Sequence, residues 1–581
     1  MFQGTMARAD DPFQELRDRI ERLEQDNNEL RSTLSKRTEE TVVPLISELP
    51  PSPKEEEDQS KMGSLVDGYL KRLSDQSQSM IELQNRKIES LESKLAEVLK
   101  NKPKPTSAAG NFGNTGLMFT SADGNFKTHF GGTAQLDFIA PQTQAANLGG
   151  LTAPPGQTNM TQDSTNFRRL RMRADGTMYN SIDWVSEFDF AGFVQNTANA
   201  SPNLADNGLR SVPGSANGGV QGGDSLNVIQ PTTVWMTFKD IPILGNLRVG
   251  NQLDWFSIEH VTSARYLDFM ERAPIMDAFS GPNNNGYTPG VSFFNNTADK
   301  NAGLQMGVYK NNAYDSGYTF SVGNAFTYGG RAIWTPYYDE CSNGRYLVHT
   351  GFGTEYRTYD TTLAANQNGE NIRMRSRGDL RIVSATLTPN FTDTGNFFAR
   401  GQTLIDPEIA VVWGPWTFQA EYTASWFDGA MTTQNVGGQK LGNAFMSGGY
   451  AELLYFLTGE NKVYNRQTGL FGQVVPTNNV NFSECKYGAW QVGARYDWMD
   501  MNSGLITGGM NQNGTVGLNW FINPNIRFQF NCVMSYIDNN ATANANAALN
   551  AAGQAAGALS GAKFTGNGLM TTLGTRMDIS F

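Results

Sequence analysis

Two runs of the chain place an arginine at every second position. In an extended strand, alternate side chains point to the same face, so each run would collect three guanidinium groups on one surface. Such a surface attracts anions and can bind carboxylate or phosphate through paired hydrogen bonds. The two trios are Arg169, Arg171 and Arg173, and Arg373, Arg375 and Arg377.

Glu187 and Asp189 show the same alternate spacing a few residues after the first trio. Two nearby carboxyl groups could act as the acid and base of a hydrolase. Their position opposite Arg171 and Arg173 on a neighbouring strand favours cross-strand ion pairs instead. Two interpretations of the first trio therefore remain open, which are anion attraction and neutralisation by these acids.

The histidines give little support to catalysis. His129, His260 and His349 lie far apart, and no serine, cysteine or carboxylate accompanies them at a known motif spacing. His129 falls on the polar face of a predicted strand, which favours a wall residue over a catalytic base. We expect no enzymatic activity, no cofactor and no metal site.

The elements that position these residues are strands with a hydrophobic period of two. The segment 569–581 shows the pattern best, because apolar residues occupy one face while Arg576 and Asp578 occupy the other. Alternation of this kind, ending on Phe581, is typical of a transmembrane β-barrel whose apolar face meets lipid. A soluble sandwich would also alternate, but aromatic residues near the strand ends favour the barrel.

Sixteen antiparallel strands are predicted. An even number of strands places the first and last residues of the barrel on the same side of a membrane. The predicted ranges are 126–139, 167–179, 182–192, 231–240, 247–254, 289–297, 302–311, 320–337, 346–359, 404–413, 416–427, 445–458, 488–500, 514–523, 526–538 and 569–581. Short joins follow most even strands and long joins follow several odd ones; the join 459–487 and the join after the seventh strand break this rule. The predicted pore-lining residues are Lys127, Arg169, Arg171, Arg173, Glu187, Asp189, Arg495, Arg527 and Arg576.

Composition excludes several other classes of protein. The chain has 56 acids and 45 bases, a net charge of −11, which argues against a nucleic-acid binder. No run of eighteen apolar residues predicts a helical membrane span. Three cysteines are too few and too odd in number for a disulfide framework.

The N-terminal part has a different composition and a period of 3.5. Only three of the 61 glycines precede residue 106, and apolar residues recur at alternating steps of three and four, as in a coiled coil. Self-association is preferred over a surface helix packed on the barrel of its own chain. The predicted core residues are Leu16, Ile20, Leu23, Asn27, Leu30, Ile88, Leu91 and Leu95.

The chain therefore divides into six predicted parts. A buried Asn27 in the coiled-coil core would set the strand number, and prolines would end both helices. The parts are a residual signal or cleavage region (1–9), a first helix (10–40), a proline-rich acidic linker (41–57), a second helix (58–101), a second linker (102–115) and the barrel (116–581).

The run from Val249 to Ala273, VGNQLDWFSIEHVTSARYLDFMERA, resembles the strand and constriction loop of the phosphate-selective porin (O and P type) family. FRRLRMRADGTMYNSIDWVSEFDF at 167–190 and NPNIRFQFNCVMSYID at 523–538 are similar to the family as well. The resemblance implies a sixteen-stranded trimeric porin whose third long loop narrows the lumen. Basic residues that attract anions would line that lumen.

The loop departs from the pattern of the family in its charge. No lysine occurs between Lys239 and Lys300, and the loop nets about −3, whereas a phosphate site needs several convergent cations or donors. Phosphate selectivity is therefore not carried over to this chain. The charged constriction-loop residues are Asp254, Glu259, Arg265, Asp268, Glu271 and Arg272, together with Asp277.

These features predict a passive outer-membrane porin of a Gram-negative-type bacterium that conducts small hydrophilic solutes or ions. Loop 255–288 would form the constriction. The coiled coil would lie in the periplasm and stabilise a homotrimer embedded in outer-membrane lipid. Two alternatives remain, which are a tether between the outer membrane and the cell wall, compatible with conduction, and a trimeric adhesin, which would need about four strands per chain.

Overall fold

The computed structural model describes most of the C-terminal part of the chain. The described residues are 68, 71, 72, 75, 86, 109–113, 116–143, 148–149, 163–191, 229–280, 287–310, 325–359, 372–380, 390–431, 440–551, 560 and 565–581. The chain forms two compact units, Thr5–Pro105 and the remainder. The predicted coiled-coil residues, from Leu16 to Leu95, lie outside the described residues.

The described residues contain a sheet of nineteen strands. Three of them, β1 (Ala109–Gly113), β2 (Gly116–Thr120) and β4 (Leu148–Gly149), are short additions, and the other sixteen form a closed antiparallel barrel. The barrel strands are β3 (Phe126–Thr143), β5 (Ser164–Met178), β6 (Ile182–Asp189), β7 (Gln230–Ile241), β8 (Gly245–Leu253), β9 (Tyr287–Asn296), β10 (Ala302–Lys310), β11 (Phe326–Tyr338), β12 (Tyr346–Thr358), β15 (Gly401–Trp413), β16 (Trp416–Met431), β17 (Lys440–Phe456), β20 (Ala489–Ser503), β21 (Ile506–Asn523), β22 (Ile526–Asp538) and β23 (Thr565–Ser580).

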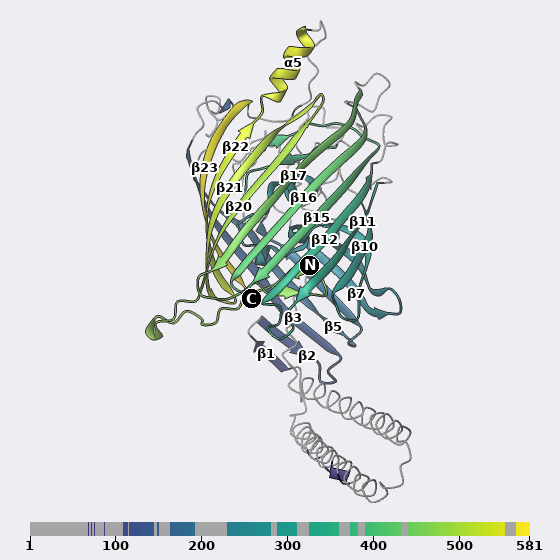
Figure 1. The fold of residues 1–581 in the computed structure, drawn as a ribbon, viewed down its shortest axis with the longest axis vertical. Helices are drawn as coiled ribbons and strands as arrows, with labels where there is room; N and C mark the ends of the chain where they lie inside the picture. Colours follow the sequence, from purple (N-terminus) through teal and green to yellow (C-terminus); the bar gives the residue numbers. More distant parts are fainter. Residues whose placement is uncertain are drawn as a thin grey trace, which may run out of the picture. The chain divides into compact units, whose positions relative to one another are not determined.

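The first and last barrel strands close the barrel. β23 pairs with β3 from Thr571 opposite Thr143 to Ser580 opposite Thr133. The N–H of Gly132 donates to the carbonyl of Phe581 at 2.7 Å. β1 and β2 form a hairpin, and β2 pairs with the first residues of β3. The hairpin lies at the end of the barrel that also holds the C-terminus (Figure 1).

Side-chain burial follows the alternation of the sequence. Leu573 of β23 and Phe581, which follows β23, are exposed, whereas Arg576 and Asp578 of β23 are buried inside the barrel. The apolar belt therefore faces outward and the polar face inward, as a transmembrane barrel requires. No helix among the described residues is long and apolar enough to cross a membrane.

The predicted sixteen-stranded barrel is confirmed, with two differences in its connections. β11 begins at Phe326 instead of 320, so a fifteen-residue join (311–325) follows the seventh strand. The long join after β17 contains β18 (Tyr464–Asn465), β19 (Leu470–Phe471) and a 3-10 turn, η5 (Phe482–Glu484). By contrast, β15 and β16 are joined by two residues, as are β21 and β22.

Candidate constriction site

Loop L3, which we define as residues 254–286, joins β8 to β9, and its residues 254–280 fold into the barrel. Its described part contains α4 (Ile258–Val261), the 3-10 turn η2 (Ala264–Tyr266) and the π-helical turn η3 (Met276–Ser280). The Ser257 hydroxyl caps α4 by accepting from the N–H of His260 at 3.1 Å. Apolar side chains such as Trp255 and Phe256 are fully buried, so the loop is packed against the wall.

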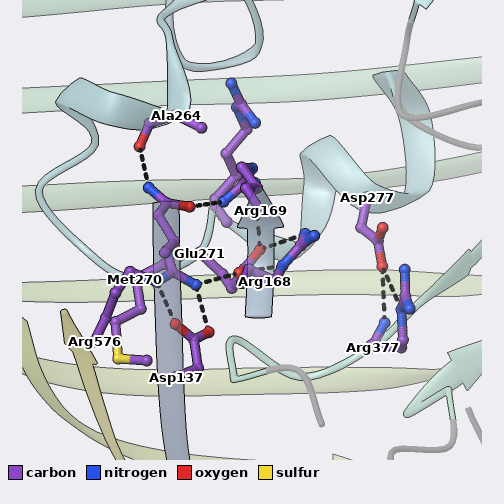
Figure 2. Close-up of polar contacts among 12 residues, drawn as sticks. Asp137, Arg168, Arg169, Ala264, Met270, Glu271, Asp277, Arg377 and Arg576 are labelled. Atoms are coloured by element: carbon purple, nitrogen blue, oxygen red, sulfur yellow. Dashed lines mark hydrogen bonds and ion pairs between the residues drawn. The ribbon is translucent and has the colours of Figure 1, made fainter. Parts of the chain in front are cut away.

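Three arginines of the wall surround Glu271 of L3, and we call this group the basic attachment. The Arg168 guanidinium donates to both Glu271 carboxylate oxygens at 2.7 and 3.0 Å. Arg576 donates to Glu271 at 2.8 Å and to Asp137 at 2.6 and 2.7 Å. Arg169 lies 4.0 Å from Glu271. Figure 2 shows Glu271 between these side chains.

A β-bulge brings Arg168 into the basic attachment. Gln135 of β3 is opposite Arg169, but Leu136 is opposite Phe167, so Arg168 is the extra residue of β5. A bulge interrupts the alternation, which allows two successive side chains to point inward. Strict alternation with Arg169 would place Arg168 on the outer face, but the bulge allows it to reach Glu271. The only sign in the sequence was the Arg168-Arg169 doublet.

On the opposite side of L3, the wall carries a cluster of three acids, which we call the acidic attachment: Asp406, Glu408 and Glu421. The N–H of Ile258 donates to Glu408 at 2.8 Å, and the N–H of Glu259 donates to Glu421 at 2.9 Å. These acids satisfy backbone donors at the start of α4, which have no partner within the helix.

Glu408 is also held by two basic side chains of neighbouring strands. Arg331 of β11 lies 2.5 Å from its carboxylate, and a His349 ring nitrogen lies 2.8 Å from it. Asp406 and Glu408 are not among the site residues predicted from the sequence. Their alternate spacing on a predicted strand, like that of Glu187 and Asp189, was the available signal.

The remaining acids of L3 also have partners. Asp254 lies 2.7 Å from His260; burial lowers the pKa of His260 to about 3 and raises the pKa of Asp254. Asp277 lies 3.6 Å from Arg377 and accepts from the Arg377 N–H at 3.1 Å. Glu259 lies 3.5 Å from Arg495.

Described residues of two further segments lie inside the barrel beside L3. Loop L5, which we define as residues 359–400, contains β13 (Arg375–Ser376) and β14 (Thr392–Asp393), and its Asp379 pairs with Arg495 at 2.8 Å. The 457–488 segment enters from the end of the barrel where the chain terminates. Its Lys462 pairs with Asp268 of L3, and Arg331 donates to the Thr468 carbonyl at 3.0 Å.

The predicted pore-lining residues occupy varied surroundings. Arg171 pairs with Asp189 at 2.8 Å and with Glu187 at 3.2 Å, which confirms the predicted cross-strand ion pairs. Lys127 is exposed near the chain-terminal end of the barrel. The others point inward but are buried, and their pore-lining role stays a prediction; they are Arg169, Arg173, Arg495, Arg527 and Arg576.

The charged residues of the inserted loops are likewise engaged. Arg265 lies 3.2 Å from Glu187, and Arg272 donates to the carbonyls of Glu259 and Thr262. Of the second arginine trio, Arg373 pairs with Asp393 at 2.6 Å, Arg377 pairs with Asp277, and Arg375 is half-buried. The barrel therefore brings L3 against the first trio at β5 and against the second trio at L5.

Comparison with known proteins agrees with this architecture. The family model of the phosphate-selective porins O and P matches residues 142–559. The chain belongs to this family. Porin O of Pseudomonas aeruginosa is 24% identical over 457 residues, which cover 74% of this chain and 87% of that protein. An uncharacterized protein of Caulobacter vibrioides is 24% identical over 424 residues, covering 71% and 69%. The protein is thus an outer-membrane porin that forms a channel.

Solved porin structures are similar at low sequence identity. An anion-selective porin from Comamonas acidovorans has a TM-score of 0.42 at 11% identity, covering 78% of this chain and all 100% of that one. The trimer form of OmpT from Vibrio cholerae has a TM-score of 0.41 at 9% identity, covering 78% and 99%. Since these scores lie below 0.5, the family assignment depends on the sequence match.

Proposed function

We propose that this porin conducts small hydrophilic solutes passively and prefers anions to cations. The proposal rests on the exposure of the charged side chains of the constriction to solvent. The Glu271 and Glu259 side chains are 3% and 4% exposed, whereas Arg377 and Arg168 are 32% and 20% exposed. The net negative charge of L3 is therefore turned toward the wall. Arg377 and Arg168 are therefore more accessible to a solute than these two acids of L3.

Part of the proposed path lies between L3 and the 457–488 segment. A cleft there is lined by Arg265, Asp268, Gly472, Arg527 and Asp578, among others. Both signs of charge occur in it, and Arg527 is held by Asp578 at 2.8 Å and by the Leu267 carbonyl at 2.7 Å. A mixed lining suits hydrophilic solutes in general, and the arginines near L3 would supply the ionic preference.

Reversal potentials of the full-length protein in planar bilayers under a salt gradient test the proposal. We expect an anion preference that decreases in Arg377→Gln and stays unchanged in Arg400→Gln, whose side chain is 72% exposed and pairs with Asp428. A cation preference of the unmodified protein would overturn the proposal. A current blocked by low phosphate concentrations would instead show a specific phosphate site, against the sequence-based expectation.

We further propose that the protein is a homotrimer stabilised by a periplasmic coiled coil. The support is the heptad pattern of residues 10–40 and 58–101 and its buried-type Asn27. Deletion of residues 10–100 should lower the thermal stability of the trimer on gels while the conductance of each channel stays unchanged. A trimer of undiminished stability after the deletion would contradict the proposed role.

A tethering role of the same coiled coil is the second candidate. The specific observation is the length of the two heptad segments, which would reach on the order of 100 Å if stacked end to end at about 1.5 Å per residue. Deletion of residues 10–100 in cells should then detach the outer membrane from the cell wall without altering conductance. An envelope that stays attached would leave trimer stabilisation as the role of the segment.

A further inference from the structure

The acidic attachment places three carboxylates where a cation would fit. Asp406, Glu408 and Glu421 each offer an oxygen atom, and these atoms all lie within 4.8 Å of one another. The three residues are 0%, 4% and 3% exposed. They come from the adjacent strands β15 and β16, whose ladder fixes their spacing independently of L3.

Two of the oxygens have no hydrogen-bond donor. Asp406 Oδ1 and Glu421 Oε2 are buried without a partner, although the other oxygen of each carboxylate is satisfied. Thr423 donates to Asp406 Oδ2, and the Tyr450 hydroxyl donates to Glu421 Oε1 at 2.5 Å. A buried carboxylate oxygen without a donor is unfavourable, so an electropositive partner between the two residues is implied.

The charges lead to the same conclusion. Arg331 neutralises one of the three carboxylates by its pairing with Glu408, and it has no contact with the free oxygens of Asp406 and Glu421. Asp406 and Glu421 form no ion pair with a described basic side chain, so their ionised forms would leave two negative charges on β15 and β16. A divalent cation would match this remaining charge, and carboxylate oxygens are the ligands that calcium and magnesium prefer.

We propose that Asp406 and Glu421, with Glu408 as a third ligand, bind one divalent cation of the calcium or magnesium class inside the barrel. The ion would fix the carboxylates that accept from the N–H groups of Ile258 and Glu259. It would therefore hold α4 of L3 against the wall. Cation binding at this site does not depend on the proposed anion preference. Its expected effect on the channel current rests on the proposed function as a conducting porin.

Calcium titration of the full-length protein, after EDTA treatment in detergent, tests the site by calorimetry. We expect one calcium ion per chain and at least a tenfold weaker affinity in Asp406→Asn and Glu421→Gln. The matched control is Glu484→Gln, which alters a 55% exposed glutamate of the 457–488 segment. Equal calcium affinity in all variants would overturn the proposal.

A second measurement needs no variant and covers the case in which a substitution prevents folding. Calcium should raise the temperature at which the unmodified protein unfolds, and terbium should bind in its place and luminesce when nearby Tyr450 is excited. Absence of both effects would show that a shared proton, instead of a metal ion, joins Asp406 and Glu421. Calcium binding without a decrease in the current noise of the channel would overturn the role assigned to α4.

Discussion

L3 is attached to the barrel wall at two places with reversed charge. At the basic attachment, one carboxylate of the loop, Glu271, meets Arg168, Arg169 and Arg576 of the wall. At the acidic attachment, carboxylates of the wall meet the backbone N–H groups of α4. The same loop is therefore held by its side chain on one side and by its backbone on the other.

The two attachments differ in how completely their polar atoms are satisfied. Both oxygens of Glu271 accept hydrogen bonds from arginines. Asp406 and Glu421 each keep a buried oxygen without a donor. Removing a partner from a satisfied buried pair is costly, whereas removing a charge from an unsatisfied group is not. Substitutions at the two places should therefore have opposite effects.

The largest effect is expected at the basic attachment. Glu271→Gln removes the charge that Arg168 and Arg576 share, and disruption of a buried ion pair costs about 3–5 kcal/mol. L3 should leave the wall more often, so the single-channel current should become noisier and its mean conductance should change. Glu484→Gln serves as the control, because Glu484 and Lys486 form an exposed pair. A quiet channel of normal conductance in Glu271→Gln would show that the basic attachment does not hold L3.

The second largest effect is expected at α4, whose attachment to the wall should depend on pH through His260. Burial keeps His260 neutral by lowering its pKa to about 3, whereas an unfolded histidine titrates near 6.5. Below about pH 6.5 the released loop therefore binds a proton that the packed loop does not. The attachment should weaken as the pH falls from about 6.5 toward 3, by at most about 1.4 kcal/mol per pH unit.

This dependence can be measured as current noise between pH 7 and pH 4, in the unmodified channel and in His260→Gln. The substituted channel should lose the additional noise at acid pH because glutamine does not titrate. Identical acid sensitivity in both channels would assign the effect to a group other than His260. The pH dependence would then not distinguish the acidic attachment from the basic attachment.

A smaller effect of the opposite sign is expected at the acidic attachment. In the presence of EDTA, Glu421→Gln removes one of three crowded charges and supplies an amide N–H for Asp406 Oδ1. The protein should gain about 1 kcal/mol or lose nothing, as measured by its unfolding temperature in detergent. A loss of stability as large as that of Glu271→Gln would mean that the carboxylates of the two attachments do not differ in how completely they are hydrogen-bonded.

The smallest effect is expected at the surface. Lys486→Ala removes the partner of Glu484, and both side chains are about half exposed (44% and 55%). Exposed ion pairs contribute about 1 kcal/mol or less. The unfolding temperature should therefore stay within the range set by repeated measurements of the unmodified protein. A large decrease would invalidate the use of this pair as a control.

The barrel was predictable because its strands are amphipathic with a period of two. The segment 569–581 already showed which side chains of β23 face inward, since Arg576 and Asp578 alternate with apolar residues. The pairs between β5 and β6 followed from the same alternation, because Arg171 lies opposite Asp189 in the ladder. Local patterns sufficed wherever the contact joins neighbouring strands.

The constriction was less predictable because its contacts join distant parts of the chain. Glu271 and Arg576 are 305 residues apart, and Ile258 and Glu408 are 150 residues apart. The net charge of L3 argued against phosphate selectivity, but composition does not reveal which way a carboxylate points. The bulge at Arg168 also broke the period on which the inward and outward assignments depended.

The contact between Gly132 and Phe581 also has a consequence for folding kinetics. The two residues join the first barrel strand to the last residue of the chain. The barrel therefore cannot close until β23 has been synthesised, and closure must bring together segments separated by more than four hundred residues. Contacts of such long range form slowly and leave unpaired strand edges exposed to aggregation. We expect the unfolded chain to need protection by chaperones until β23 has reached β3.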